Sequence, residues 1–338
     1  MKAGRIMAIR WGIAGPGRIA EKFAAALDQC DSKTGYLAAA ASTSLDRALK
    51  FAAGQKRDLK SYGSYTELAA DPDIDAVYIS NLHVGHARIS EMMLNSGKSV
   101  LCEKPLALNL SEVERMQKAA LNNNAFLMEA MWTRFLPAIA KVRKWLQEGR
   151  IGRVMNVSAP FSEKFPDDPG SRIFDINLGG GGLLDIGVYP VSMAQMVFGG
   201  YPEKILSQAV IGPTGVDEMS SVILDYGSLK HAQLTITTKC RLDNRLIITG
   251  DMGRIEVPDF VFADKAYLYE NSIDHVARTH VFTDELKADF SHEIKAAMEC
   301  ISEGKLECPI MSWEDSRKVM SVMDELRRQW GLVYPQEK

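Results

Sequence analysis

The fold of this chain is decided by one stretch near its start, IRWGIAGPGRIA, residues 9–20. Its first half is an apolar run with the length of a buried β-strand, and a helical pattern continues over residues 19–29. Between the two, Gly15 permits a tight turn and Gly17 lets the backbone approach a diphosphate. The small Ala20 lets the helix pack on the strand. The stretch therefore predicts a dinucleotide-binding strand-turn-helix unit.

Short apolar runs and helical patterns continue to alternate up to about residue 132, as they do in a doubly wound parallel sheet. A capping box of Ser111 and Glu114 is expected to open the helix over residues 111–122. Residues 1–132 are therefore predicted to form a dinucleotide-binding Rossmann domain. We expect its further strands over residues 37–42, 76–80, 98–102 and 126–131, and its further helices over 45–53, 65–70, 86–97 and 111–122.

Beyond a helix expected over residues 136–148 the pattern changes. Short connections between strands are typical of an antiparallel or mixed sheet. Residues 133–338 are therefore predicted to form an α+β domain for substrate binding and dimerisation, with a large, mainly antiparallel open sheet. We expect strands over residues 154–161, 205–211, 220–226, 232–238, 245–250 and 254–257, and helices over about 291–303 and 313–330.

The composition excludes several classes of protein. The 338 residues, of which 46% are hydrophobic, are enough for a large core in two domains. A net charge of -3 with interspersed charges indicates neither a nucleic-acid surface nor a polybasic membrane patch. The five cysteines lack C-x-x-C spacing and the six histidines form no metal motif, so no metal is expected. Without a membrane span or secretory signal in the sequence, we expect a soluble cytoplasmic protein.

The end of the second expected strand bears on the choice between NAD and NADP. A carboxylate usually stands there and binds the ribose 2′-hydroxyl of NAD. Here residues 42–47 read STSLDR, and the acidic Asp46 lies inside the next helix. Ser42, Thr43 and Arg47 can instead bind a 2′-phosphate. The alternative is that residues 42–44 only cap the helix and Arg47 is solvated. We therefore predict a preference for NADP, with NAD as the alternative.

A lysine stands at the end of another expected strand, in the segment SVLCEKP, residues 99–105. Because proline restricts the residue before it to extended geometry, Lys104 is held at the carboxyl end of the strand. Ligands bind at that end of an open parallel sheet. A lysine there can donate a proton or polarise a hydroxyl or carbonyl group if its pKa is lowered. The alternative is an ordinary surface lysine at a turn.

A glycine run leads into a second candidate site, GGGGLLDIGVY, residues 179–189. Ordering glycines is costly, so such a run usually brings the backbone close to something. A helix is expected to start near Leu183, and Asp185 and Tyr189 then share one of its faces. Opposite a lysine, this carboxylate and phenol can form a proton-transfer set. The alternative is a flexible loop with Asp185 near a helix start and Tyr189 packed.

Several segments, spanning nearly the whole chain in order, carry a resemblance: WGIAGPGRIA (11–20), EKP (103–105), MEAMWTRF (128–135), the glycine run to Tyr189, and MDELR (323–327) with Tyr334-Pro335. In these segments the chain resembles the Gfo/Idh/MocA oxidoreductase family. More narrowly, it resembles the branch that contains dimeric dihydrodiol dehydrogenases and NADP-dependent D-xylose dehydrogenases. EKP and MEAMWTRF are the specific matches, whereas the glycine loop is common to many families.

The resemblance implies a Rossmann domain joined to an α/β substrate domain, with the nicotinamide where they meet. It implies that Lys104 is the catalytic lysine, faced by Asp185 and Tyr189, where many relatives have histidine in place of the tyrosine. Trp132 and Phe161 would then line the substrate pocket, with Arg134 as a polar contact. The expected cofactor contacts are Gly15, Gly17, Arg18, Ile19, Ser42, Thr43, Arg47, Ser80, Glu103 and Lys104.

One segment departs from the family pattern. The family often has Thr-Pro where this sequence has Asn81-Leu82. The departure puts nicotinamide contacts from Ser80, Asn81 and His83 in question. His86 keeps the family's spacing, and a structural role at the start of a helix is expected for it.

The expected activity is reversible hydride transfer between a nicotinamide cofactor and a secondary hydroxyl or hemiacetal carbon of a sugar, polyol or cyclic diol. Tyr189 or Lys104 would accept the hydroxyl proton. One alternative is a reductase of a dicarbonyl sugar such as an anhydrofructose, and another is a catalytically silent dinucleotide-binding sensor. A sensor needs none of the three site residues. An open sheet with few helices to cover it favours a homodimer formed through that sheet.

Overall fold

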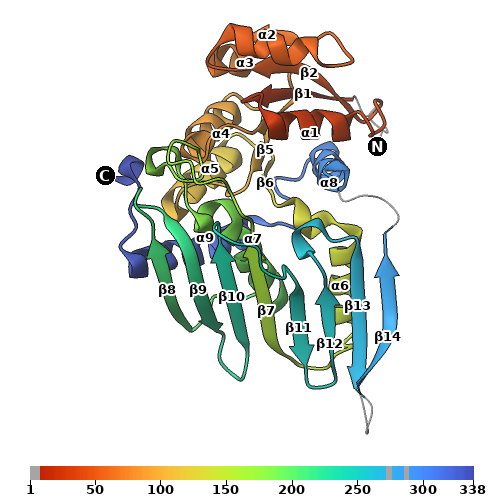
Figure 1. Cartoon of the computed structure of the whole chain (residues 1–338). Coiled ribbons are helices and arrows are strands. Elements are labelled where there is room, and N and C mark those ends of the chain that lie inside the picture. Colours follow the sequence, from red (N-terminus) through yellow and green to blue (C-terminus); the bar gives the residue numbers. More distant parts are fainter. Residues whose placement is uncertain (1–7, 272–275, 285–288) are drawn as a thin grey trace. The chain divides into compact units, whose positions relative to one another are not determined.

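The computed structural model describes residues 8–271, 276–284 and 289–338. These residues divide into two compact units, which Figure 1 shows in one view. The first unit ends at Trp132 and also takes in Asp289–Ser316. The second unit begins at Thr133 and includes Arg317–Lys338. Within the described ranges, no helix is long and apolar enough to cross a membrane.

The first unit is built on a parallel sheet with the strand order β3-β2-β1-β4-β5-β6. This order confirms the predicted doubly wound fold. Strand β3 was not predicted, because its three residues are half-exposed and show no apolar pattern. The strands are β1 (Ile9–Ala14), β2 (Gly35–Ala41), β3 (Lys60–Tyr62), β4 (Ala76–Ile79), β5 (Ser99–Glu103) and β6 (Leu127–Ala130).

Helices pack on this sheet through apolar side chains. Phe23 stacks on the ring of Tyr78 at 3.9 Å between centroids, and Trp11 meets Phe23 edge-on at 5.5 Å. Helix α1 also contacts α8, a helix that comes from far along the chain, while α4 contacts both α3 and α5. The helices are α1 (Arg18–Leu27), α2 (Leu45–Ala53), α3 (Tyr65–Ala70), α4 (His86–Asn95), α5 (Leu110–Asn122) and α8 (Ser291–Ser302).

The predicted capping box of α5 is wrong by two residues. The cap is Asn109, whose side chain accepts the Glu112 N–H at 3.0 Å. The Glu112 carboxylate in turn accepts the Leu108 N–H at 3.0 Å. Ser111 and Glu114 are exposed on the helix. The sequence offers two polar pairs with the spacing of a capping box, and the helix starts at the earlier one.

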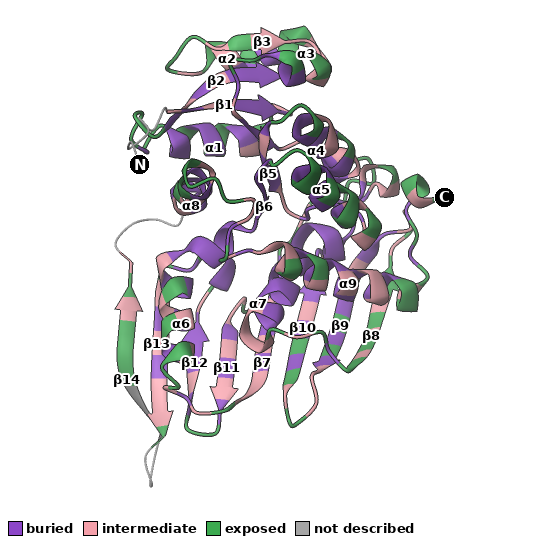
Figure 2. Ribbon diagram, turned by 180° about the vertical axis from the view of Figure 1, so that it is seen from behind, coloured by how far each residue is buried: buried purple, intermediate pink, exposed green. Residues whose placement is uncertain are grey.

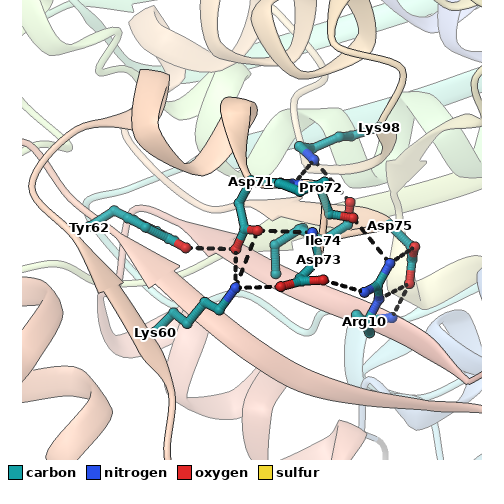
Figure 3. Close-up of polar contacts among 9 residues, drawn as sticks. All are labelled: Arg10, Lys60, Tyr62, Asp71, Pro72, Asp73, Ile74, Asp75 and Lys98. Atoms are coloured by element: carbon teal, nitrogen blue, oxygen red, sulfur yellow. Dashed lines mark hydrogen bonds and ion pairs between the residues drawn. The ribbon is translucent and has the colours of Figure 1, made fainter.

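A polar cluster lies at the amino ends of the strands of this sheet (Figure 3). The buried ammonium of Lys98 donates to the carbonyl oxygens of Asp71 and Ile74 at 2.6 and 2.9 Å. This cluster holds the loop before β4 and lies at the opposite edge from the glycine loop after β1. We call it the amino-end cluster, and its side chains are Arg10, Lys60, Tyr62, Asp71, Asp73, Asp75 and Lys98.

The second unit is built on a mixed sheet with the strand order β14-β13-β12-β11-β7-β10-β9-β8. Only β7 and β10 pair in parallel among these neighbours, so the prediction of a mainly antiparallel sheet is confirmed. Strands β13 and β14 were not predicted. The strands are β7 (Val154–Ser162), β8 (Lys204–Ile211), β9 (Asp217–Asp225), β10 (His231–Thr237), β11 (Leu246–Gly250), β12 (Gly253–Val257), β13 (Lys265–Asn271) and β14 (Val276–Thr283).

The helices of this unit cover one face of the sheet (Figure 2). They are α6 (Pro137–Gln147), α7 (Val188–Phe198) and most of α9 (Trp313–Trp330). Side chains alternate between the two faces, so that Val222 and Leu224 of β9 are buried while Ile223 between them is 42% exposed. In the part of the unit that the structure describes, the opposite face of the sheet carries no helix (Figure 1). Because Ile223 is exposed, we assign its side chain to that face.

Candidate active site

The predicted glycine loop follows β1 and makes a close backbone approach. Gly15 has φ +94°, and a Cβ there would lie 2.7 Å from the backbone nitrogen of Asn81. Gly17 caps α1 without a side chain, and both Gly17 and Arg18 are exposed. Since no side chain of the cap accepts the first N–H groups of α1, the helix start is suited to bind an anion.

Two further loops reach the same edge of the sheet. The Ser80 hydroxyl, after β4, donates to the carbonyl oxygen of Gly15 at 3.0 Å. The buried His86 ring lies 3.0 Å from the carbonyl oxygen of Asn81 and 2.8 Å from that of Pro105. Burial lowers the pKa of His86, although both carbonyl contacts favour the charged ring. His86 therefore links the loop after β4 to the loop after β5.

Lys104 directly follows the last residue of β5 and is half-buried. Its peptide bond to Pro105 is cis. The preceding Glu103 accepts a hydrogen bond from the buried hydroxyl of Tyr78. Strand β5 stands two places from β1 in the sheet, which corresponds to about 10 Å. The first unit thus presents the glycine loop and the predicted lysine at one edge.

The residues after β2 also lie at this edge. Arg47 donates to the Thr43 hydroxyl at 2.6 Å, and both side chains are exposed. Ser42 is buried, and Ser44 precedes α2 without a side-chain hydrogen bond to the helix start. The Ser44 hydroxyl therefore does not cap α2. A groove of about 760 Å³ runs between α1 and α2, with Arg47 among its lining residues.

In the second unit the glycine run is packed tightly against the chain itself. A Cβ at Gly180 would lie 2.7–2.8 Å from three carbonyl oxygens, and one at Gly181 would lie 2.4 Å from Asp217 Oδ1. The glycine run thus brings the backbone close to other atoms, as predicted, and these atoms belong to the protein itself. The predicted helix begins with a π turn over Leu183–Gly187 and continues as α7. Such turns are frequent at functional sites.

The π turn carries Asp185, which is only 3% exposed. Its Oδ1 accepts a hydrogen bond from Arg172 Nη1 at 2.7 Å. The Arg172 side chain is 43% exposed and reaches the carboxylate from the loop before the glycine run. Sequence reasoning did not single out Arg172, because that loop has no motif and the partner lies further along the chain.

Tyr189 follows one turn after Asp185 and is also buried. The ring of Phe161 on β7 meets the Tyr189 ring edge-on, with 5.5 Å between centroids. Phe161 also meets the ring of Phe260 edge-on, with 5.7 Å between centroids. The structure therefore brings together three of the predicted residues of the second unit, Asp185, Tyr189 and Phe161, and adds Arg172.

Arg134 was expected to contact substrate, and its surroundings indicate another role. The residue is 2% exposed, and its guanidinium donates to the hydroxyl and carbonyl oxygens of Ser192 at 2.9 Å each and to Gln195. These contacts commit Arg134 to α7, the helix that carries Tyr189. Trp132 is 7% exposed and meets Phe290 edge-on at 5.3 Å.

No cluster of metal-binding side chains occurs among the residues described in the structure.

Comparisons with known proteins agree with one another. A family model for an oxidoreductase family with an NAD-binding Rossmann fold matches residues 9–131, and the model of the GFO/IDH/MocA C-terminal domain matches residues 139–256. Two relatives are each named trans-1,2-dihydrobenzene-1,2-diol dehydrogenase. The one from Xenopus laevis is 38% identical over 97% of this chain and its own full length. The one from Homo sapiens is 35% identical over 98% of this chain and its own full length.

Solved structures share the fold over nearly the whole chain. KijD10, a 3-ketoreductase from Actinomadura kijaniata solved with NADP and TDP-benzene, is 28% identical with a TM-score of 0.83, over 95% of this chain and 97% of that one. An aldose-aldose oxidoreductase from Caulobacter crescentus is 23% identical with a TM-score of 0.83, over 96% and 98% of the two chains. At that identity the second likeness concerns the fold alone.

Proposed function

Because this chain belongs to the Gfo/Idh/MocA family of NAD(P)-binding oxidoreductases, we propose that it transfers a hydride between the nicotinamide and a CH–OH carbon of a cyclic diol, polyol or sugar. The observation that carries the proposal is the identity of 34–38%, over 97–98% of the chain, to relatives named as dihydrodiol dehydrogenases. We assign dinucleotide binding to residues 1–132, and substrate binding and dimerisation to residues 133–338.

The residues of the first unit fit a dinucleotide. The backbone at Gly15 leaves no room for a side chain, and the start of α1 offers free N–H groups to a diphosphate. Bound there, the cofactor supplies the hydride chemistry. The residues that we propose to hold it are Gly15, Gly17, Arg18, Ile19, Ser42, Thr43, Arg47, Ser80, Glu103 and Lys104.

The protein's own part in the reaction is to orient the substrate and to move the hydroxyl proton. Tyr189 or Lys104 accepts that proton during oxidation. Asp185, whose carboxylate is paired with Arg172, orients the hydroxyl. Trp132 and Phe161 offer aromatic surface to the apolar ring of a cyclic diol. Arg134 contributes through α7 rather than by touching the substrate.

Two substitutions test these roles. Lys104→Met and Tyr189→Phe should each lower kcat by roughly 10²–10⁴, because each removes a proton-handling group, while the Kd for NADPH should change little in Tyr189→Phe. The assay follows reduced nicotinamide with a panel of cyclic diols and aldoses, including trans-1,2-dihydrobenzene-1,2-diol. Lys118→Met and Tyr201→Phe, at exposed positions, serve as matched controls. A fully active Lys104→Met enzyme contradicts the assignment, and a wild type that turns over nothing in the panel contradicts the function.

A reductase acting on a ketone or dicarbonyl sugar is the second candidate. It is favoured by the likeness to KijD10, which is described as a 3-ketoreductase. Steady-state rates measured in both directions distinguish the two candidates, because a reductase would have the larger kcat/KM with NADPH and a carbonyl substrate. A catalytically silent sensor would show no change in nicotinamide absorbance with any substrate.

We also propose that NADP is preferred to NAD. The support is the exposed pair of Thr43 and Arg47 after β2, where the residues of the strand end include no carboxylate. Comparable kcat/KM values with NADPH and NADH would overturn this preference.

The open face of the second sheet supports the proposal of a homodimer. Directly paired residues form a row across five strands, which runs Leu206, Ile223, Gln233, Ser158, Ile247. Leu206 and Ile223 are 49% and 42% exposed. A second copy of the same face would remove this apolar area from water. A monomeric mass by light scattering at micromolar concentration would contradict a dimer.

A cytoplasmic location is proposed from the cysteines. All five are free thiols, and four of them are buried. Reduced thiols are typical of cytoplasmic proteins. Fractionation of cells that produce the untagged protein tests this location, and recovery outside the cytoplasm would contradict it.

A further inference from the structure

Asp217, the first residue of β9, is a buried carboxyl group that no motif indicated. The residue is 1% exposed. Its Oδ2 accepts the N–H of Leu183 at 2.7 Å, at the start of the π turn. Its Oδ1 is also buried and accepts a hydrogen bond from no described residue. A buried carboxyl oxygen without a partner is costly, so the rest of the surroundings must hold it in place.

The glycine run is shaped around this carboxyl group. A Cβ at Gly181 would lie 2.4 Å from Asp217 Oδ1, and one at Gly182 would lie 3.2 Å from Oδ2. Gly181 also has φ +117°, a conformation that side chains rarely adopt. The carboxyl group thus lies directly against the backbone, and glycine is needed at Gly181 for both reasons.

The C-terminal segment, residues 334–338, holds the glycine run from another direction. The buried hydroxyl of Tyr334 donates to the carbonyl oxygen of Gly180 at 2.7 Å. The Arg327 guanidinium lies 5.1 Å from the centre of the Tyr334 ring and pairs with Glu337 at 2.7 Å. Two elements far apart in sequence, β9 and the C-terminal segment, therefore fix the backbone between Gly180 and Leu183.

From this arrangement we infer that Asp217 is a positioning residue, which holds the Gly181–Leu183 backbone and thereby sets the orientation of Asp185 and Tyr189. The link is short, since the Asp185 N–H bonds to the carbonyl oxygen of Gly181 at 3.2 Å and Tyr189 follows one turn later. The inference rests on the proposed function, in which Asp185 and Tyr189 handle the substrate hydroxyl.

The carboxyl group also changes its charge in a useful range of pH. Burial raises the pKa of Asp217 to about 6, against the opposing effects of the Leu183 N–H and Arg327. The ionisable groups that act on it are Arg327 on α9 and Tyr334 of the C-terminal segment. The glycine run, which packs beside the carboxyl group, carries no charge. Ionisation places a negative charge at the start of the turn, where a helix favours one.

The test compares Asp217→Asn, which keeps an oxygen acceptor but cannot ionise, with Asp217→Ala, which has no acceptor. We expect kcat at neutral pH to fall by roughly 10²-fold in Asp217→Ala and to recover only in part in Asp217→Asn, because the turn regains an acceptor but not the negative charge. The KM for NADP should stay close to wild type. The kcat profile of the wild type should inflect near pH 6, and that of Asp217→Asn should lack the inflection.

Asp175→Asn is the matched control. Asp175 accepts the Asn177 N–H at 2.8 Å at the start of a neighbouring short helix, and this contact is exposed. The control should keep the wild-type kcat and pH profile. Wild-type kcat in Asp217→Ala, or an inflection near pH 6 that survives in Asp217→Asn, would overturn the inference. If Asp217→Ala does not fold, the pH profile of Asp217→Asn decides.

Thermal unfolding separates this inference from the proposed function. The pKa of the native carboxyl group is raised from 3.8 to about 6, so its contribution to stability is complete below pH 3.8 and is lost as the pH rises through 6. The Tm of the wild type should therefore fall relative to that of Asp217→Asn over this range. A wild type without turnover defeats the proposed function, whereas a Tm difference independent of pH defeats the role of Asp217.

Discussion

At the scale of single residues, the candidate site consists of side chains that local patterns indicate and side chains that they miss. Gly15 and Lys104 stand where a strand-and-turn pattern places them, because the strand end and the turn are neighbours in sequence. Arg172 and Asp217 escaped notice because their partners lie 13 and 34 residues away. Arg134 belongs to a specific motif, yet its guanidinium is bonded to α7.

Arg47 is the residue on which the cofactor preference depends. In Arg47→Ala, the Kd for NADPH should rise roughly 10-fold or more, because charge-assisted hydrogen bonds to the 2′-phosphate are lost. The Kd for NADH should change little. Fluorescence titration with both cofactors measures this difference, and Lys22→Ala, at an exposed position of the same unit outside the groove, is the control. Equal weakening of both cofactors in Arg47→Ala would contradict a 2′-phosphate contact.

At the scale of elements, the glycine run before the π turn is the most constrained segment of the site. Gly180→Ala would place a methyl group 2.7–2.8 Å from the carbonyl oxygens of Ile173, Arg172 and Asp175. We expect it to lower the free energy of unfolding by about 1–3 kcal/mol, as overpacking does. Urea unfolding measures the loss. Gly200→Ala, where a Cβ has no neighbour within 4 Å, should be close to neutral. Wild-type stability in Gly180→Ala would contradict the packing described.

The amino-end cluster makes a second prediction at this scale. Burial by itself raises the pKa of Asp71, but hydrogen bonds from Tyr62, the Asp73 N–H and Lys60 lower it to about 2. The ionised carboxylate therefore stabilises the fold above its unfolded pKa of 3.8, and this contribution is lost as the pH falls through 2. Asp71→Asn should cost about 2 kcal/mol of unfolding free energy at neutral pH.

Urea unfolding of Asp71→Asn and wild type at neutral pH and near pH 2 checks this prediction, because the two proteins should converge in acid. Asp58→Asn, at an exposed position of the same unit, is the control. A difference that persists unchanged near pH 2 would show that Asp71 does not act through its charge.

At the scale of the whole molecule, the open sheet face makes a prediction about assembly. Ile223→Asp places a charge beside the exposed Leu206 on the open sheet face and should convert a dimer to a monomer in light scattering. Met252→Asp, at a 61% exposed position in the hairpin between β11 and β12, should leave the dimer intact. A dimer that survives Ile223→Asp would place the interface elsewhere.

Local patterns were sufficient for much of the architecture. The parallel sheet, the change to short antiparallel connections and most helix bounds follow from periodicity and turn residues, which act between neighbours in sequence. The family motifs added the catalytic candidates. Strands β3, β13 and β14 went unpredicted, because their residues do not show the clear apolar alternation on which a strand prediction depends.

Other features depend on contacts between distant residues. Only the tertiary structure shows that α8 joins the first unit, that Arg172 pairs with Asp185, and that Asp217 lies against the glycine run. No spacing rule encodes these contacts, because they arise when separately formed elements pack and must satisfy each other's buried polar groups. The residue types in the chain thus define the possible chemistry, while packing selects the neighbours that position it.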